Sequence, residues 1–284
     1  MNSVKTVALP SGRQIPILGQ GTWRMGEDRS RRETEISALR LGIELGMTLI
    51  DTAEMYGEGG AEEVIAEVIK GQRGQVFVVS KVYPHNATRK STIQACERSL
   101  RRLQTDYLDC YLLHWRGSVP LNETIEAFQT LRRTGKILDY GVSNFDTADV
   151  KEAFGLPGGD EIVINQVLYN LEHRGIEFEL LPWSKNHGLP IMAYSPVGHS
   201  PAGQKGLLGD RTVRLVAERH GATPAQVALA WLLQGDVIAI PKASNLDHVR
   251  ENRGALDLRL TGRDLGDLDE AFPPPRTKVP LEME

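Results

Sequence analysis

The sequence predicts an α/β chain folded as a (β/α)₈ TIM barrel, with a short β-hairpin before the first barrel strand. The chain has 284 residues, which is close to the ~250 that one such barrel needs. Eight short runs rich in β-branched and apolar residues alternate with longer stretches of helical periodicity. Because no change in composition marks a second domain, residues 1–284 are assigned to a single barrel domain.

The hairpin is predicted at the start of the chain, where residues 4–9 and 13–17 flank the turn-forming Pro10-Ser11-Gly12. The barrel strands are expected at 18–21, 48–51, 76–81, 108–114, 139–143, 162–166, 190–195 and 237–241. Each is followed by a helical stretch, so neighbouring strands are expected to run parallel through right-handed crossovers.

Helices are expected after these strands, at 31–45, 61–70, 90–103, 122–134, 147–154, 176–186, 212–233 and 246–255. Thr88 or Ser91 can cap the third helix, and Asn122 precedes the fourth. The Thr223-Pro224 pair opens a helix inside the seventh stretch, with proline in its first turn.

An open, doubly wound sheet is the alternative to a barrel. That fold usually cradles a pyrophosphate on a GxGxxG motif after its first strand. Here Gly19-Gln20-Gly21 is only a fragment of the motif, which favours the barrel. The proline-rich tail 272–284 is expected to lie over the surface.

The composition argues against several classes of protein. A net charge of −4 and a pI near 6.0 do not suit a general nucleic-acid or acidic-membrane binder. Cys96 and Cys110 form no CxxC pair and are expected to be reduced packing residues. The N-terminus has no signal-peptide pattern, and no apolar run approaches the ~20 residues that span a bilayer. The chain is therefore expected to be cytoplasmic, and a monomer because the predicted site needs no second copy.

The most informative feature is the polar residue that ends seven successive strands. Taken singly, each has a structural explanation as a helix cap, a turn former or a solvated side chain. In a barrel, however, these strand ends converge on the C-terminal face, where active sites lie. Their joint placement predicts a site made of Asp51, Lys81, His114, Ser143 with Asn144, Gln166, Tyr194 with Ser195, and Lys242 with Ser244.

Asp51, Tyr56, Lys81 and His114 together predict a proton donor for a carbonyl oxygen. A phenol has a pKa of ~10, and a nearby lysine ammonium lowers that pKa. Asp51 would keep the lysine charged, and a neutral His114 could hold the carbonyl by a hydrogen bond. Because this group holds neither a nucleophile nor an electron source, the hydride must come from a bound cofactor.

The other strand ends suit such a cofactor. Ser143, Asn144 and Gln166 could bind a carboxamide, and Tyr194 could stack on a flat ring. The segment 241–252 joins basic side chains to the N-terminus of a helix. Backbone N–H groups and the helix dipole both favour an anion there, so a phosphate site is predicted.

The sequence resembles the aldo-keto reductase superfamily over nearly its whole length. The resemblance rests on LGQGTW at 18–23, DTAEMYGEGGAEEVIAEVI from Asp51, VSKV at 79–82, DYLDCYLLHW from Asp106, GKILDYGVSNF from Gly135, NQVLYN from Asn165, AYSPVG from Ala193 and IPKAS from Ile240. The wording of GTWRMGED and LLHWRGS is also similar to a bacterial branch that includes methylglyoxal reductases.

The resemblance implies an NADPH-dependent reductase without a metal, which passes a hydride to an aldehyde or ketone. Tyr56 would donate the proton, Lys81 and Asp51 would tune it, and His114 would orient the substrate. The implied nucleotide-binding positions are Gly21, Thr22, Trp23, Asp51, Ser143, Asn144, Gln166, Tyr194, Ser195, Pro196, Val197, Lys242, Ala243, Ser244, His248, Glu251 and Asn252.

One departure from the family concerns the phosphate end of this site. His248 stands where many members have an arginine, which is always charged and binds phosphate bidentately. Arg250 could compensate, and Lys242 still favours the phosphorylated nucleotide. NADP(H) is therefore the expected cofactor, with NAD(H) left open.

A second departure concerns the substrate. The loop after His114 and the C-terminal tail are short beside those of steroid-handling members of the family. A small aldehyde or dicarbonyl is therefore expected, in a compact pocket formed by Trp23, Tyr56, Tyr83, His114 and Trp115.

Two other functions are considered. The family resemblance includes channel-associated subunits that bind the nucleotide and act mainly as sensors, with little turnover. Schiff-base chemistry through Lys81, as in aldolases, would need a neutral lysine. Asp51 and Tyr56 beside Lys81 predict a charged one instead.

Overall fold

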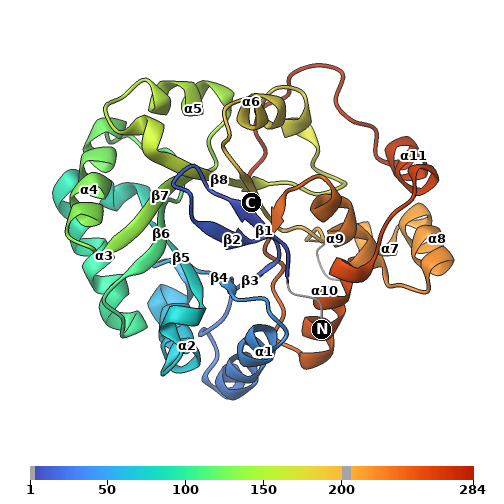
Figure 1. Ribbon diagram of the computed structural model, residues 1–284, viewed down its shortest axis with the longest axis horizontal. Coiled ribbons are helices and arrows are strands. Elements are labelled where there is room, and N and C mark those ends of the chain that lie inside the picture. The colour runs from blue at the N-terminus through green and yellow to red at the C-terminus, as the bar shows by residue number, and fades with distance from the viewer. Residues whose placement is uncertain (1–3, 200–205) are drawn as a thin grey trace.

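The computed structural model describes residues 4–199 and 206–284, and within them eight parallel strands form a barrel (Figure 1). The strands are β3 (Gly19–Gly21), β4 (Leu49–Asp51), β5 (Phe77–Val82), β6 (Leu108–Leu113), β7 (Ile137–Ser143), β8 (Ile162–Leu168), β9 (Ile191–Tyr194) and β10 (Ile238–Ala239). Each strand pairs with the next one in the chain. Parallel bridges from Leu18 to Ala239 and from Gly21 to Lys242 join the first strand to the last. The predicted architecture is confirmed.

Side chains along each strand alternate between the inside of the barrel and the helix layer. Inward positions in the N-terminal half of the strands carry Leu49, Phe77, Val79, Cys110 and Leu112, which belong to one buried apolar cluster. Further along the same strands, the inward positions become polar. The apolar cluster therefore fills the N-terminal half of the barrel and leaves the polar strand ends at the other half.

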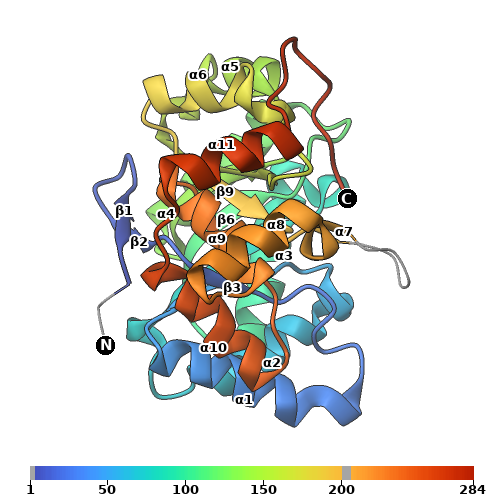
Figure 2. The ribbon, with the colours of Figure 1, turned by 90° about the vertical axis from the view of Figure 1, so that its right-hand side faces the viewer.

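The hairpin covers the N-terminal end of the barrel, and Figure 2 shows it on the side away from the C-terminus. Its strands, β1 (Thr6–Ala8) and β2 (Gln14–Pro16), pair antiparallel. Ile15 packs into the apolar cluster inside the barrel. The Arg13 guanidinium donates to Asp109 at 2.5 Å and to Asp139 at 3.1 Å. The predicted hairpin is confirmed, and it closes this end of the barrel.

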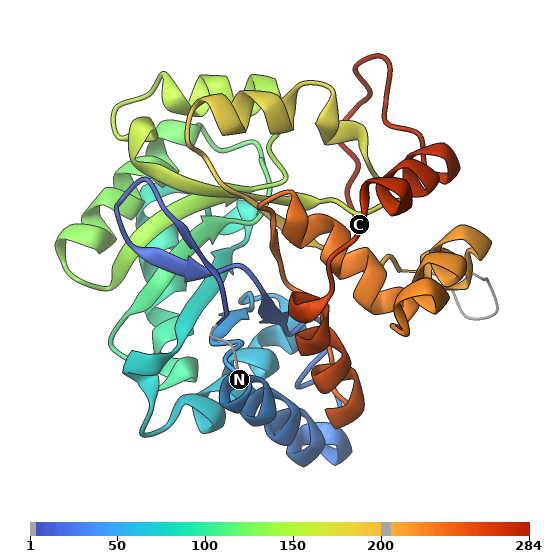
Figure 3. The ribbon, with the colours of Figure 1, turned by 45° about the vertical axis from the view of Figure 1, so that its right-hand side comes forward.

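Helices surround the barrel (Figure 1, Figure 3): α1 (Arg32–Glu44), α2 (Gly60–Ile69), α3 (Arg89–Leu103), α4 (Leu121–Arg133), α5 (Thr147–Phe154), α6 (Leu180–Asn186), α9 (Pro224–Gln234) and α10 (Leu246–Gly254). Their apolar faces form a second buried cluster with outward-facing strand residues. Thr88 caps α3 by accepting from the Ser91 N–H. Thr223 caps α9 in a capping box with Gln226, so both start signals are confirmed.

Two other helix predictions are wrong at their N-termini. α4 begins at Leu121, so Asn122 lies inside its first turn and is not its cap. The helix expected at 176–186 begins only at Leu180, because Gly175–Glu177 forms a separate 3₁₀ turn. In both places the apolar periodicity was the right signal for the helix, but the first turn depends on neighbouring structure.

The C-terminal third has more helices than the sequence predicted. The stretch 212–233 is two helices, because Gly221 adopts a left-handed φ of 59° that ends α8 (Arg211–His220) before α9 begins. α7 (Gly206–Gly209) and α11 (Gly262–Ala271) were not predicted. The sequence of α11, GRDLGDLDEA, carries two glycines, which disfavour a helix interior and obscure the helix in the sequence.

The tail after α11 returns to the C-terminal end of the barrel (Figure 3). The Arg174 guanidinium donates to the Phe272 carbonyl at 2.5 Å, and Lys278 pairs with Glu179 at 2.9 Å. Most of the tail is exposed, as expected, but its last two residues reach the C-terminal end of the barrel. In residues 4–199 and 206–284, no helix is long and apolar enough to cross a bilayer.

Candidate active site

A cavity of about 590 Å³ lies at the C-terminal end of the barrel, and the polar strand ends line it. Because parallel strands end at the same face, residues far apart in the sequence meet there. Of the predicted site residues, the cavity gathers Gly21, Thr22, Trp23, Asp51, Tyr56, His114, Trp115, Ser143, Asn144, Gln166, Tyr194, Ser195, Pro196, Val197 and Lys242.

Lys81 is the centre of the predicted catalytic group. It is fully buried on β5, next to β4, and lies behind the cavity wall. Its Nζ donates to Asp51 Oδ2 at 2.7 Å and to the Thr52 carbonyl at 2.8 Å. The third bond goes to the Tyr56 hydroxyl at 3.2 Å. The ammonium thus has a partner for each of its three hydrogens, and it fixes the phenol at the wall of the cavity.

A tight loop between β4 and α2 places Tyr56 at that wall. The three residues after it, Gly57, Glu58 and Gly59, all have a left-handed φ, of 57°, 52° and 94°. This backbone conformation favours glycine, which explains the GEGG sequence around the one exception, Glu58. The loop therefore turns sharply after Tyr56 and enters α2.

Burial and the charges within the group together determine its protonation. Burial raises the pKa of the Asp51 carboxyl, and the Lys81 ammonium opposes that rise. For Lys81, burial favours the neutral form, but Asp51 and Tyr56 outweigh it and raise the pKa, so the lysine stays charged. Burial also raises the pKa of Tyr56, and the Lys81 charge offsets this only in part. The prediction of a lowered Tyr56 pKa is therefore wrong for the net shift, although the lysine acts in the expected direction.

His114 follows β6 and lines the same cavity. Its ring centroid lies 5.9 Å from that of Tyr56. Burial, and then the Lys81 charge, lower the pKa of His114 to about 2. Its buried Nδ1 has no hydrogen-bond partner among the residues that the structure describes. The imidazole is therefore neutral near pH 7, as predicted, and it can donate one hydrogen bond from one nitrogen.

A second polar group adjoins the catalytic one. Gln166 Nε2 donates to Asp51 Oδ1 at 2.7 Å, so the two groups share the Asp51 carboxylate. Asn144 has a left-handed φ of 58°, and its Nδ2 donates to the His114 carbonyl at 3.1 Å. Its Oδ1 accepts from the Tyr194 hydroxyl at 2.9 Å. Two amide side chains and a flat ring therefore meet beside the predicted proton donor.

Two serines lie at the sides of this group. Ser143 Oγ donates to the Gln166 carbonyl at 2.8 Å. Ser195 follows β9 with a left-handed φ of 46°, and its hydroxyl donates to Glu284 Oε2 at 2.5 Å. The tail thus touches a residue that the family resemblance places in the nucleotide-binding site.

The residues predicted for the phosphate end lie along a path from the cavity to α10. Lys242 lines the cavity and donates to Ser244 Oγ at 3.1 Å. Asn245 then caps α10. The others on this path do not line the cavity: Ala243, Ser244, His248, Glu251 and Asn252. His248 is exposed, whereas Asn252 is buried.

The predicted aromatic pocket is formed in part. Trp23 and Trp115 line the cavity together with Tyr56 and His114. Tyr83 lies behind Trp115, edge-on at a centroid distance of 5.5 Å, and does not line the cavity itself. It supports the wall instead of forming it.

The cavity also contains residues that were not singled out from the sequence: Arg24, Met55, Gly198, His199, Ile240, Met283 and Glu284. Arg24 and His199 flank the Trp23 ring, at 4.4 Å and 5.4 Å from its centroid. Several of these residues lie within or next to the motifs, which is a signal that could have suggested them. Met283 and Glu284 have no such signal, because only the path of the tail brings them here.

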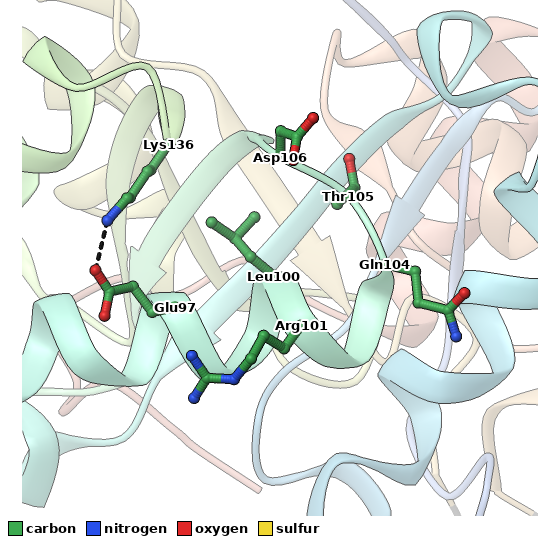
Figure 4. Close-up of a pocket in the computed structure, with 7 residues that line it drawn as sticks. All are labelled: Glu97, Leu100, Arg101, Gln104, Thr105, Asp106 and Lys136. Carbon is green, nitrogen blue, oxygen red and sulfur yellow. Dashed lines mark hydrogen bonds and ion pairs between the residues drawn. The ribbon is translucent and has the colours of Figure 1, made fainter.

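A second cavity, of about 410 Å³, lies at the opposite end of the strands (Figure 4). Its residues come from α3 and from the segments that precede β6 and β7. In Figure 4, Lys136 pairs with Glu97 across it. It gathers none of the predicted site residues, so the cavity at the C-terminal end is the candidate active site.

Curated proteins with similar sequences match nearly the whole chain. The protein-family model described as "Aldo/keto reductase family" matches residues 17–272 of the chain. The chain is 53% identical over 271 residues to methylglyoxal reductase YeaE of Escherichia coli (strain K12), with 95% of each chain covered. It is 34% identical over 269 residues to a glyoxal reductase of Bacillus subtilis (strain 168), covering 93% of this chain and 91% of that one.

Solved structures agree with the sequence matches. An aldo-keto reductase from Klebsiella pneumoniae in complex with NADPH has a TM-score of 0.96 and 48% identity, with 100% of both chains covered. An aldo/keto reductase from the same organism, in complex with NADP and acetate, has a TM-score of 0.95 at 48% identity, covering 99% of this chain and 100% of that one. The chain belongs to the aldo/keto reductase family.

Proposed function

We propose that this chain is an NADPH-dependent reductase of small aldehydes and ketones, with Tyr56 as the proton donor. The observation that carries the proposal is the contact of one buried ammonium, Lys81, with both the Asp51 carboxylate and the Tyr56 hydroxyl. A neutral His114 lines the same cavity. A phenolic proton and an uncharged imidazole are therefore available to one carbonyl oxygen.

The residues of the cavity fit a nicotinamide nucleotide. Gln166 and Asn144 offer amide groups, and the Tyr194 ring lies beside them. Ser195 and Lys242 extend the lining towards α10, whose N-terminus favours an anion. The Klebsiella pneumoniae relatives hold NADPH or NADP, which supports the phosphorylated form. When bound, this nucleotide supplies the hydride.

The residues of the chain have separate tasks in the proposed reaction. His114 donates a hydrogen bond to the carbonyl oxygen and turns it towards Tyr56. Tyr56 gives its proton to that oxygen as negative charge develops there. The Lys81 ammonium, 3.2 Å from the phenol, stabilises the phenolate that remains. Asp51 holds the ammonium and also accepts from Gln166, which keeps the proton donor in register with the nicotinamide end.

The substrate is a small carbonyl compound, with dicarbonyls such as methylglyoxal the preferred class. Two large rings, Trp23 and Trp115, line the cavity, and Met283 of the tail adds to its lining. The relatives named methylglyoxal reductase and glyoxal reductase support this class. A monomer is the proposed working unit, because Asp51, Tyr56, Lys81 and His114 of one barrel already form the catalytic group. In the described part of the chain, no observation favours the alternative of a nucleotide sensor with little turnover.

The test is the nicotinamide absorbance of NADPH or NADH with purified protein and a panel of methylglyoxal, glyoxal and simple aldehydes. We expect substrate-dependent oxidation of NADPH, fastest with the dicarbonyls. Tight nucleotide binding without turnover on any carbonyl would favour the sensor. Failure to bind either nucleotide would contradict the proposal altogether.

A further inference from the structure

Glu54 is a nearly buried carboxylate in the loop that carries Tyr56, and the proposed reaction does not use it. Its side chain is 7% exposed. Glu54 Oε1 accepts from the Tyr83 backbone N–H at 2.9 Å and from Asn86 Nδ2 at 3.0 Å. Its Oε2 faces Arg98 of α3 at 3.6 Å. Hydrogen bonds to a charged carboxylate are stronger than neutral ones, so this side chain is held in one place.

Through these contacts Glu54 joins two loops at the active-site face. Its own backbone N–H donates to the Lys81 carbonyl at 3.3 Å, near the end of β5. Its carboxylate binds Tyr83, the first residue after β5. The side chain and the backbone of Glu54 therefore both join the loop with the proton donor to the segment that ends in Tyr83.

Tyr83 carries this constraint to the cavity wall. Its ring meets Trp115 edge-on at 5.5 Å, and it lies 6.3 Å from the His114 ring. His114 has anchors of its own, since its N–H donates to the Val82 carbonyl at 3.0 Å and its carbonyl accepts from Asn144. Trp115 lies beyond the strand and is only half-buried, and its ring packs on His114 at 4.9 Å and on Tyr83 at 5.5 Å. Trp115 is therefore the part of the wall that depends most on Tyr83.

We propose that Glu54 is a positioning residue for substrate binding, because it holds Tyr83, and through it Trp115, against the substrate cavity. The inference rests on the proposed carbonyl reduction. It assigns Glu54 to the binding of the substrate and not to the chemical step, because other contacts fix Tyr56 and His114.

Two substitutions separate the reach of Glu54 from its charge. Glu54→Asp keeps the charge but withdraws the carboxylate by one methylene, whereas Glu54→Gln keeps an acceptor oxygen at the same reach. For Glu54→Asp we expect the KM for methylglyoxal to rise about tenfold with kcat within about threefold, as when ground-state and transition-state binding are lost equally. For Glu54→Gln we expect the KM to stay within about twofold of the original, since the bond to the Tyr83 N–H can still form.

The matched control is Glu58→Gln, an exposed glutamate of the same loop. It makes the same change of charge without the contacts to Tyr83, and its KM should not change. A fluorescence titration with NADPH, expected to be unaltered, reports for every variant that the fold and the nucleotide site are intact. If Glu54→Gln raised the KM as much as Glu54→Asp does, the proposal would be overturned. The charge of Glu54, and not the reach of its side chain, would then determine substrate binding.

A double-mutant cycle tests the route through Tyr83. Tyr83→Ala alone should raise the KM about tenfold, and Glu54→Asp added to it should raise the KM no further, because coupled residues are not additive. If the KM increase of the double variant equalled the product of the two single increases, the proposal would be overturned. If Glu54→Asp does not bind NADPH and so has not folded, Tyr83→Ala decides alone, and an unchanged KM there overturns the proposal.

The original protein is measured first, so that two failures can be told apart. If it reduces no carbonyl, the proposed function fails and this inference with it. If it reduces methylglyoxal and Glu54→Asp has the same KM, only the role of Glu54 is overturned.

Discussion

The two ends of the barrel both bury charged side chains, but the charges have different neighbours. At the N-terminal end, Asp109 accepts from Arg13 at 2.5 Å and from Arg73 at 2.7 Å. These contacts bind the hairpin and the segment before β5 to β6. At the C-terminal end, the Lys81–Asp51 pair adjoins a phenol and a cavity of about 590 Å³. One set of charges joins segments of the fold, and the other leaves a polar wall exposed to a ligand.

The two groups differ in whether a donor or acceptor remains available for a ligand. Asp109 receives a guanidinium on each oxygen, and its Oδ2 also accepts the Val78 N–H at 2.9 Å. Lys81 can only donate, so the Tyr56 hydroxyl accepts from it and keeps its own proton to give. The first arrangement stabilises the closed end of the barrel. The second arrangement keeps the Tyr56 hydroxyl available at the wall of a cavity. Functional sites in general depart from the rules of a well-paired core in this way.

Tyr56→Phe is expected to have the largest effect, and to act on the C-terminal end alone. It removes the proton donor but keeps the ring, so kcat should fall about 10³-fold. The Kd of NADPH should stay within about twofold, because the phenol acts in the transition state. Steady-state kinetics and a fluorescence titration measure the two quantities. If the variant kept full activity, another group would have to supply the proton.

Asp109→Asn is expected to lower the stability of the fold without lowering turnover. The free energy of unfolding should fall by about 3 kcal/mol, because the two guanidinium groups lose the carboxylate that they share. Turnover should not change, since Asp109 lies at the far end of the strands. Urea unfolding and kinetics check both statements, with the exposed Asp106→Asn as a control expected to change stability by less than about 0.5 kcal/mol. A loss of kcat in folded Asp109→Asn would mean that the two ends are coupled.

The barrel and the core of the candidate site could be predicted because both depend on local signals. Strands and helices alternate visibly, and the polar strand ends mark the inner face wherever they occur. The order Asp51, Tyr56, Lys81, His114 then needs only a closed parallel barrel to become a cluster, and that cluster is what the structure contains.

What could not be predicted depends on distant segments or on burial. No local pattern places Met283 and Glu284 at the cavity, because the tail reaches it only through contacts such as Arg174 with Phe272. Tyr83 stands behind the wall and not in it, a difference of one layer of packing. The net direction of the Tyr56 pKa was missed because the sequence shows the lysine but not the burial that outweighs it.

The pH dependence of stability offers a second way to test the C-terminal end. The pKa of His114 is about 2 in the fold and ~6.5 in an unfolded chain, so between these values only the unfolded chain binds the proton. Stability is therefore lost as the pH falls below about 6.5, and from pH 7 to pH 5 this amounts to about 2 kcal/mol. His114→Gln should lack this loss, and urea unfolding at both pH values measures it.

The control is His187→Gln, which replaces an exposed histidine outside the cavity. Its loss of stability between pH 7 and pH 5 should equal that of the original protein. If His114→Gln lost as much stability on acidification as the original, His114 would be open to water in solution. The part of the cavity wall that carries Tyr56 would then be more accessible to water than its buried contacts indicate.

The smallest effect is expected at the exposed end of the proposed nucleotide site. His248 lies on the surface of α10, and Arg250, which was expected to assist it, is bonded to Asp247 at 3.1 Å. His248→Ala should raise the Kd of NADPH about threefold and leave that of NADH unchanged, because an exposed contact to a phosphate is weak and only NADPH carries that phosphate. His248→Arg should tighten NADPH alone by a similar factor, since a guanidinium binds phosphate bidentately. Equal changes for both nucleotides would remove His248 from the phosphate site and leave Lys242, on the cavity lining, as the residue that selects NADPH.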